Sequence, residues 1–110
     1  MERYNLDTIF DNFKIWIKSK EDKWKEREVV IDEIAEATHA HQIHVKLHSQ
    51  SGYGHIGLFE NNNTYWIEFE GVARNFENFY KFVEIGDKLP NFDEIEIAYI
   101  DFLTKENLFN

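Results

Sequence analysis

Residues 54–70 read GHIGLFENNNTYWIEFE, and their pattern is the most informative in the chain. On both sides of its polar middle, apolar residues alternate with other residues, and this period of two predicts β-strands. The middle contains the asparagines at 61–63, which favour a turn because asparagine tolerates left-handed backbone angles. We therefore predict a β-hairpin with one apolar face. The residues expected on that face, in the core, are Ile56, Leu58, Tyr65, Ile67 and Phe69.

The other face of the predicted hairpin has an unusual composition. It combines two large aromatic side chains, Phe59 and Trp66, with His55 and with the carboxylates of Glu68 and Glu70. Aromatic residues kept among charged groups are typical of a surface that a partner protein covers. The alternative is that a loop or the C-terminal segment of the same chain folds over the aromatic residues.

Amphipathic helices are predicted near both ends of the chain. In residues 5–24, apolar residues recur at helical spacing, and Asn5 can cap the start. A second helix is predicted at 92–104, where apolar residues step by three or four after Pro90. The alternation of residues 94–97 also fits a strand, so a strand is the alternative there.

Three further strands complete the predicted sheet. Residues 42–49 alternate most clearly, whereas 27–34 show no clean apolar face and could instead continue as a helix. Residues 76–85 fit either a strand or a helix, and their aromatic and β-branched content favours the strand. We therefore predict a single α+β domain over residues 1–110. It is an antiparallel meander sheet of about five strands, with the N- and C-terminal helices packed on one face.

The chain is acidic, and its charge is unevenly distributed. It has 12 lysines and arginines against 21 aspartates and glutamates, which gives a formal net charge of −9. Most of the excess follows residue 27, because residues 1–27 hold seven basic and six acidic groups. An acidic body repels nucleic-acid phosphates and anionic lipid and attracts basic surfaces. We therefore expect a protein partner, no nucleic acid and no membrane, although an acidic surface can also serve solubility alone.

The composition also bears on cellular location. There are no cysteines, which excludes a disulfide scaffold, thiol catalysis and a cysteine-based zinc site. The apolar runs are too short to span a bilayer, and the first ten residues lack the layout of a secretion signal. A cytoplasmic location is the expectation.

Few residues offer catalytic or metal-binding chemistry. The histidines match no metal-binding spacing, and Lys46, between two of them, opposes a bound cation. They are His39, His41, His44, His48 and His55. Paired glutamates could serve acid–base catalysis only within a concave pocket, which the sequence does not show. The candidates are Glu68, Glu70, Glu94 and Glu96. We expect no enzyme activity, no cofactor and no metal.

A pattern within the central stretch is shared with a known family. Its residues here are Gly54, Ile56, Phe59, Glu60, Ile67 and Glu68. This pattern resembles the core of small immunity proteins from bacterial polymorphic-toxin systems, in particular the family called TriTu. That family has a Gly-x-Ile/Leu-x-Val-Trp-Glu strand, a turn with glycine, and a Leu-Glu-Val strand. Here Phe59 stands in place of the usual tryptophan, Gly57 replaces a strand residue, and asparagines lengthen the turn.

The resemblance implies a function that agrees with the charge of the chain. An immunity protein is a stoichiometric inhibitor that binds one toxic enzyme, here a nuclease or another toxin with a basic surface. An acidic inhibitor is attracted quickly to a basic cleft, and buried aromatic anchors slow its release. The residues we expect to contact the toxin are Phe59, Trp66, Glu68, Glu70, Asp93, Glu94 and Glu96.

Two other classes of function remain open. The chain could be a different binding module, such as an adaptor or a homodimerising regulatory domain that uses the same open sheet. It could also be a small enzyme or ligand carrier with a pocket between the sheet and the helices. An upstream toxin gene would favour the immunity protein, and a deep polar pocket would favour the enzyme or carrier.

Overall fold

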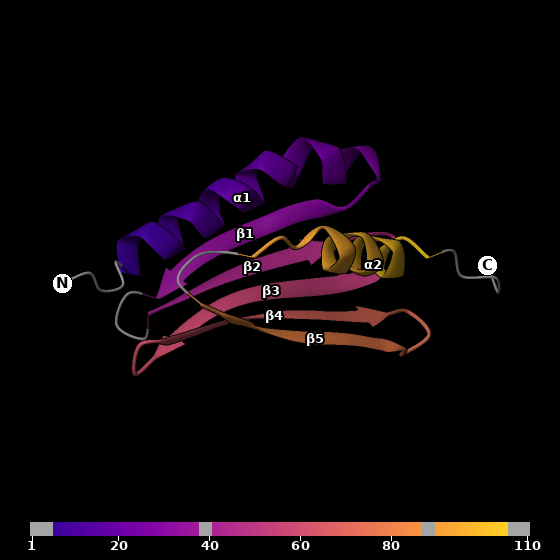
Figure 1. Ribbon diagram of the computed structural model, residues 1–110. Coiled ribbons are helices and arrows are strands. Elements are labelled where there is room, and N and C mark those ends of the chain that lie inside the picture. The colour runs from indigo at the N-terminus through magenta and orange to yellow at the C-terminus, as the bar shows by residue number, and fades with distance from the viewer. Residues whose placement is uncertain (1–5, 38–40, 87–89, 106–110) are drawn as a thin grey trace.

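A computed structural model describes residues 6–37, 41–86 and 90–105 of the chain. They form two helices and five strands (Figure 1). In chain order these are α1 (Leu6–Glu26), β1 (Val30–Ala37), β2 (Gln42–His48), β3 (Gly52–Asn61), β4 (Thr64–Ala73), β5 (Asn78–Ile85) and α2 (Asp93–Leu103). The first helix ends two residues beyond the predicted 24, and the predicted cap Asn5 lies outside the described residues.

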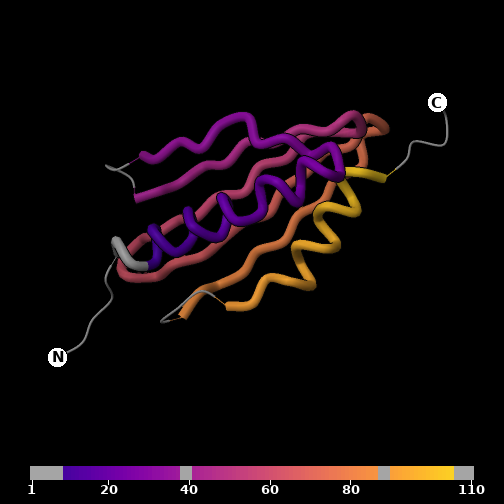
Figure 2. Tube along the Cα trace, turned by 90° about the horizontal axis from the view of Figure 1, so that it is seen from above, coloured from indigo at the N-terminus to yellow at the C-terminus, as the bar shows by residue number. Residues whose placement is uncertain are grey.

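The strands form one antiparallel sheet in which each strand pairs with its neighbours in sequence. The order is β1-β2-β3-β4-β5. Both helices cover the same face of this sheet, α1 running diagonally across it and α2 lying toward the β5 side (Figures 1 and 2). The predicted α+β class, with a five-stranded meander and helices at both ends, is confirmed.

The central hairpin is formed by β3 and β4, as its alternation predicts. Asn61 pairs with Thr64, which leaves a turn of two residues, Asn62 and Asn63. Their φ angles are 52° and 65°. Two consecutive left-handed residues are what a tight hairpin turn needs, and asparagine adopts this conformation more readily than most residues.

The helix-facing side of the sheet builds the core. The predicted hairpin residues Ile56, Leu58, Tyr65, Ile67 and Phe69 are all fully buried there. Both helices meet the sheet around the ring of Phe69. It makes edge-on contacts with Trp16 of α1 at 6.4 Å between ring centroids, and with Tyr99 of α2 at 5.5 Å. Such aromatic pairs stabilise a core beyond the area they bury.

The first strand lies further along the chain than the predicted 27–34. A turn follows α1, where Glu28 takes a φ of 65°, and β1 then runs to Ala37. The register with β2 shifts between Ile31 and Glu33, which marks a β-bulge. The bulge breaks the alternation of this segment, so the sequence shows no clean apolar face. The alternative of a helical continuation is wrong.

The two ambiguous segments near the C-terminal end take the predicted forms. Residues 78–85 form β5, so the helical alternative for 76–85 is wrong. Residues 93–103 form α2, so the strand alternative is wrong there. Phe92 is the N-cap residue of α2, and the side-chain oxygen of Asn91 just before it accepts the backbone N–H of Asp93 at 2.7 Å.

Two glycines let α2 lie close against the sheet. Gly54 on β3 and Gly71 on β4 are direct cross-strand neighbours. A β-carbon at Gly54 would overlap the hydroxyl of Tyr99, and one at Gly71 would lie 3.1 Å from the ring of Phe102. The side chains of α2 therefore fill the space that two ordinary strand residues would occupy.

A buried carboxylate joins the two helices. Glu96 of α2 is 3% exposed, and the indole N–H of Trp24 donates to it at 2.9 Å. Lys20 and Lys23 of α1 lie 3.1 and 3.4 Å from its two oxygens. Burial raises the pKa of Glu96, but the Trp24 hydrogen bond and the two lysines together outweigh burial and hold it below 4.5.

Candidate partner-binding face

The sheet face turned away from both helices carries the candidate site, and we call it the open face. Cross-strand pairing places alternate residues of each strand on it. Its members on β3, β4 and β5 are Tyr53, His55, Gly57, Phe59, Trp66, Glu68, Glu70, Val72, Asn78, Tyr80, Phe82 and Glu84. No described element covers these residues. For the described residues, the alternative that a loop or the C-terminal segment folds over the aromatic residues is therefore wrong, and residues 106–110 lie outside the described part of the chain.

A row of stacked aromatic rings crosses the open face. Phe59 stacks on Trp66 with ring centroids 5.5 Å apart, and Trp66 stacks on Phe82 at 6.4 Å. Gly57 makes room for this row, because a β-carbon there would lie 2.7 Å from the Phe59 ring. The glycine that departs from the immunity-protein pattern thus allows Phe59 to lie flat across the sheet.

Exposed apolar side chains are concentrated on the open face. Of eight exposed large hydrophobic residues in the described part of the chain, five lie there: Val30, Tyr53, Val72, Tyr80 and Phe82. Tyr53 is 69% exposed and Phe82 is 53% exposed. Single exposed apolar residues are ordinary, but a contiguous group on one face marks an interaction surface.

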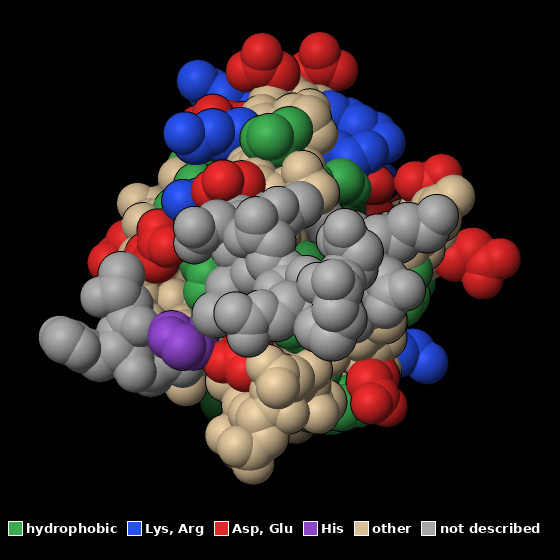
Figure 3. Space-filling model, turned by 60° about the vertical axis from the view of Figure 1, so that its left-hand side comes forward, with side chains coloured by type: hydrophobic (Ala, Val, Ile, Leu, Met, Phe, Trp, Pro, Cys, Tyr) green, Lys and Arg blue, Asp and Glu red, His purple; other side chains and the backbone are tan. Residues whose placement is uncertain are grey.

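The charged side chains that β3, β4 and β5 place on the open face are all acidic. Glu68, Glu70 and Glu84 lie among the aromatic residues, and the alternating positions of β3–β5 bring no lysine or arginine to this side. Glu68 accepts the indole N–H of Trp66 at 2.8 Å. The basic side chains gather instead on α1, across the sheet, where Figure 3 shows them among acidic ones at the top of the view.

Two histidines on this face form a hydrogen-bonded pair. His44 Nδ1 lies 2.8 Å from His55 Nε2, and His44 Nε2 lies 2.8 Å from the side-chain oxygen of Gln42. Gln42 therefore receives the His44 proton, and His55 donates to His44, which leaves Nδ1 of His55 without a proton. Burial, and next the repulsion that a protonated ring would meet beside the His44 imidazole, lower the pKa of His55 below 6.5. His55 is accordingly neutral near pH 7.

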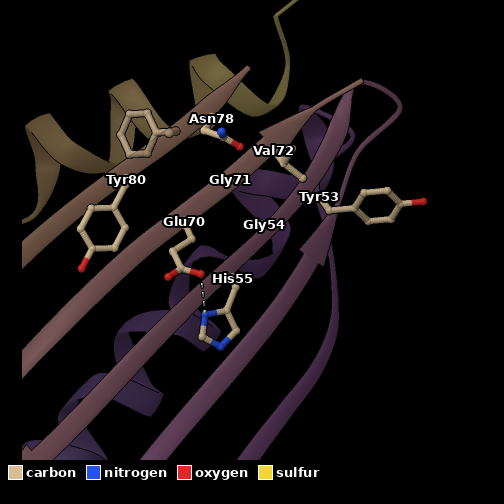
Figure 4. A pocket seen from close by; sticks show the side chains of 9 residues that line it. Tyr53, Gly54, His55, Glu70, Gly71, Val72, Asn78 and Tyr80 are labelled. Carbon is tan, nitrogen blue, oxygen red and sulfur yellow. Dashed lines mark ion pairs between the residues drawn. The ribbon is translucent and has the colours of Figure 1, made fainter. Parts of the chain in front are cut away.

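A shallow pocket of about 370 Å³ lies at one corner of the open face. Two cross-strand rows surround it, His55–Glu70–Tyr80 and Tyr53–Val72–Asn78, and its floor includes Gly54 and Gly71. In Figure 4, the carboxylate of Glu70 points toward His55 beside the ring of Tyr80, whereas Tyr53 points outward on the opposite side. Nδ1 of His55 lies 4.0 Å from a Glu70 oxygen. The pocket offers ring faces and a carboxylate, which suit a cationic group.

The structure divides the predicted contact residues into two sets. Phe59, Trp66, Glu68 and Glu70 lie together on the open face, as predicted. The other three belong to α2, on the helix side of the sheet. Asp93 and Glu94 are exposed there. The expectation that Glu96 is a surface contact is wrong, because Trp24 and two lysines hold it in the interior.

The prediction of the face missed three exposed aromatic residues, Tyr53, Tyr80 and Phe82. The expected alternation of residues 76–85 already placed the last two opposite the core positions, and this signal could have identified them. Tyr53 precedes the predicted hairpin, and its place becomes clear only from its cross-strand pairing with Val72.

The described histidines and acidic residues provide no group of three that could hold a metal ion. His44, His48 and His55 do share the open face, but His48 binds Asp32 at 2.8 Å instead of joining the other two. His39 lies outside the described residues. Neither described helix is long and apolar enough to cross a membrane.

Comparison with known proteins gives no match, whether to a family model, a curated protein or a solved structure. The resemblance of residues 54–70 to immunity proteins therefore stays a prediction. The chemistry of the open face carries the functional argument.

Proposed function

We propose that this domain binds a protein with a basic surface through its open face, and that it acts as an immunity protein. In this role it neutralises a cognate bacterial toxin, such as a nuclease, as a stoichiometric inhibitor. The observation that carries the proposal is the exposed aromatic row of the open face, set among carboxylates, with no lysine or arginine of β3, β4 or β5 on that face.

The aromatic residues supply the stabilising part of such an interface. Rings dominate the binding energy of protein interfaces because they bury a large area with few rotatable bonds. Trp66 is already fixed by stacking between Phe59 and Phe82 and by its hydrogen bond to Glu68. A side chain that is ordered before binding loses little conformational entropy when the partner covers it.

The carboxylates speed association and select the charge of the partner. Opposite charges accelerate association and exclude partners of the wrong sign. A second copy of the same open face would bring Glu68, Glu70 and Glu84 against like charges. This argues for a basic partner over the homodimer. A cytoplasmic location suits the role, because an immunity protein must meet its toxin inside the cell that it protects.

The test uses the product of the gene next to this one, upstream. We expect co-expression to protect cells from that product and to give a stable equimolar complex by size-exclusion chromatography. The variant Trp66→Ala/Phe82→Ala should lose both protection and complex while keeping its helical and sheet content.

Two outcomes of this test would contradict the proposal. If the neighbouring product is harmless, or forms no complex with the intact chain, the immunity function fails. If a complex forms but the double variant binds unchanged, the open face is not the contact surface. An adaptor would instead bind a protein that is not toxic on its own.

A further inference from the structure

The pocket at the corner of the open face specifies the chemistry of one contact. We propose that it receives an arginine side chain of the protein partner, with the guanidinium paired to Glu70 and stacked on the ring of Tyr80. This inference rests on the proposed function, because the arginine belongs to the protein that covers the open face. The partner must then present an arginine side chain to this pocket.

Glu70 is the charged group available to a ligand in this pocket. Its side chain is 50% exposed, and its one ion-pair contact among the described residues is with His55 at 4.0 Å. Lys46, on the same face, is the cross-strand neighbour of His55 and contacts Glu33 at 3.7 Å. A cation brought by a partner therefore meets a carboxylate that no described lysine or arginine neutralises.

His55 does not act as that cation. Its Nε2 proton is donated to His44, and its Nδ1 has no hydrogen-bond partner among the described residues. Protonation of Nδ1 would place a positive charge beside His44 in a half-buried position, and both effects lower the pKa of His55. The histidine is thus a neutral wall of the pocket, and the Glu70 charge stays available.

The shape of the pocket favours arginine over lysine. Tyr80 is the cross-strand neighbour of Glu70 and is 55% exposed, so a ring face stands directly beside the carboxylate. A guanidinium is planar and can lie on a ring while it donates two hydrogen bonds to one carboxylate. An ammonium group is compact and strongly hydrated, so it gains less from the ring.

The pocket is also held in place from beneath. On the far side of the sheet, the hydroxyl of Tyr99 donates to the backbone carbonyl of Glu70 at 2.7 Å. His55 is the cross-strand neighbour of Glu70. The two residues are therefore fixed relative to each other before any ligand arrives, which reduces the ordering cost of binding.

Arginine itself, presented without the partner, gives the first test. The ¹⁵N-labelled chain is titrated at low ionic strength with N-acetyl-arginine amide and, separately, with N-acetyl-citrulline amide, which has the same shape without the charge. We expect the arginine compound to shift the amide signals of His55, Glu70, Gly71 and Tyr80 at least threefold more than the citrulline compound. Glu70→Gln should abolish the difference, whereas Glu84→Gln, the same change elsewhere on the open face, should leave it intact.

Three results would overturn the inference. They are equal shifts with both compounds, shifts scattered over the acidic surface, and a response of Glu70→Gln that matches the wild-type chain. Because the small compounds need no partner, this titration decides the pocket even if the immunity function is wrong.

The complex with the toxin gives the second test and separates the two proposals. If the complex forms, Glu70→Gln should weaken it at least tenfold and Glu84→Gln less than threefold. A complex that loses equally little from both changes refutes the arginine pocket and leaves the immunity function standing. Failure of any complex to form refutes the immunity function alone, since the titration has then already decided the pocket.

Discussion

The hydroxyl of Tyr99 on α2 occupies the position where Gly54 on β3 would carry a β-carbon. The same hydroxyl donates to the Glu70 carbonyl at 2.7 Å, so one side chain both packs on the glycine and bridges to the adjacent strand. The close approach of the last helix to the sheet therefore depends on the absence of a side chain at residue 54.

This relationship predicts the effect of Gly54→Ala. We expect it to lower the free energy of unfolding by about 2 kcal/mol, because the added methyl group displaces Tyr99. Tyr99→Phe alone should cost about 1 kcal/mol through the lost hydrogen bond. The double variant should cost less than the sum by at least ~0.5 kcal/mol, because the methyl group then overlaps no hydroxyl. Urea unfolding measures all three, and strict additivity would contradict the contact.

Gly86→Ala is the matched control for this substitution. No atom of the described residues lies within 4 Å of a β-carbon at this exposed glycine, and its φ is not positive. We expect the unfolding free energy to stay within about 0.5 kcal/mol of the wild-type value or to rise slightly. A large loss at Gly86 would mean that glycine-to-alanine changes in this chain report something other than helix approach.

The buried carboxylate between the helices leads to a second prediction. Glu96→Ala should lower the unfolding free energy by about 2–3 kcal/mol, because it leaves the indole N–H of Trp24 buried and unpaired. Glu96→Gln keeps an acceptor for that N–H and should cost less. Glu94→Ala, on the exposed side of the same helix, should change stability by less than ~0.5 kcal/mol.

The stabilisation that the Glu96 carboxylate gives the fold depends on pH in a defined direction. Because the folded state holds the pKa of Glu96 below 4.5, its charge stabilises the fold fully above pH 4.5. The stabilisation is lost as the pH falls through the lower folded value. The stability difference between the wild-type chain and Glu96→Gln should therefore narrow on acidification from pH 6. A difference that widens would show that the carboxylate is protonated in the fold.

His55 gives a third prediction, which NMR can test directly. The groups that face its ring are His44 and Lys46 on β2 and Glu68 and Glu70 on β4. We expect its imidazole signals to titrate with a midpoint below 6.5. Protonation then favours the unfolded chain, so this histidine lowers stability as the pH falls below 6.5 and adds nothing above it.

Two substitutions should move that midpoint in opposite directions. Glu70→Gln removes a negative charge that favours the protonated ring, so the midpoint should fall further. Lys46→Gln removes a positive charge that opposes it, so the midpoint should rise. Shifts of the same sign in both variants would contradict the placement of these charges around His55.

The open face gives a fourth prediction, with a control on the opposite side of the molecule. Phe82→Ala should weaken binding of the partner toxin at least tenfold, because exposed rings on this face become interface anchors. Ile97→Ala removes a similarly exposed side chain from α2 and should change affinity less than twofold. Phe82 is 53% exposed and Ile97 is 55% exposed. Calorimetry measures both, and equal losses would place the contact elsewhere.

Charge reversal on the two sides gives a fifth prediction. Glu68→Lys/Glu70→Lys should slow association with a basic partner at least tenfold at low salt, and added salt should reduce the effect. Asp93→Lys/Glu94→Lys makes the same charge change on α2 and should have the smaller effect. Stopped-flow association rates distinguish the two pairs. A larger effect from the α2 pair would move the binding surface to the helix side.

Much of the fold could be predicted because its sequence pattern is local. The hairpin of β3 and β4 is predicted by its alternating apolar residues and its asparagine turn. Both helices are predicted by apolar residues at helical spacing. The first strand was misplaced because the bulge between Ile31 and Glu33 interrupts the alternation that marks a strand. A bulge depends on pairing with β2, which no local pattern reveals.

The site was predictable in part, for the same reason. Phe59, Trp66, Glu68 and Glu70 share a face by strict period of two within a single hairpin. Glu96 lies next to two isoleucines and resembles any exposed helical glutamate in sequence. Its burial follows from Trp24, an indole that needs an acceptor and stands 72 residues earlier in the chain.

The strand order carries a consequence for how the chain assembles during its synthesis. Because every strand pairs with the one made just before it, the sheet can form progressively, hairpin by hairpin, with short loops to close. The contact between Trp24 and Glu96 must wait until the last helix has been made. Until then, only α1 can cover the helix-facing side of β3 and β4, while the open face is already complete. A nascent chain would thus present its acidic aromatic surface before its core is closed.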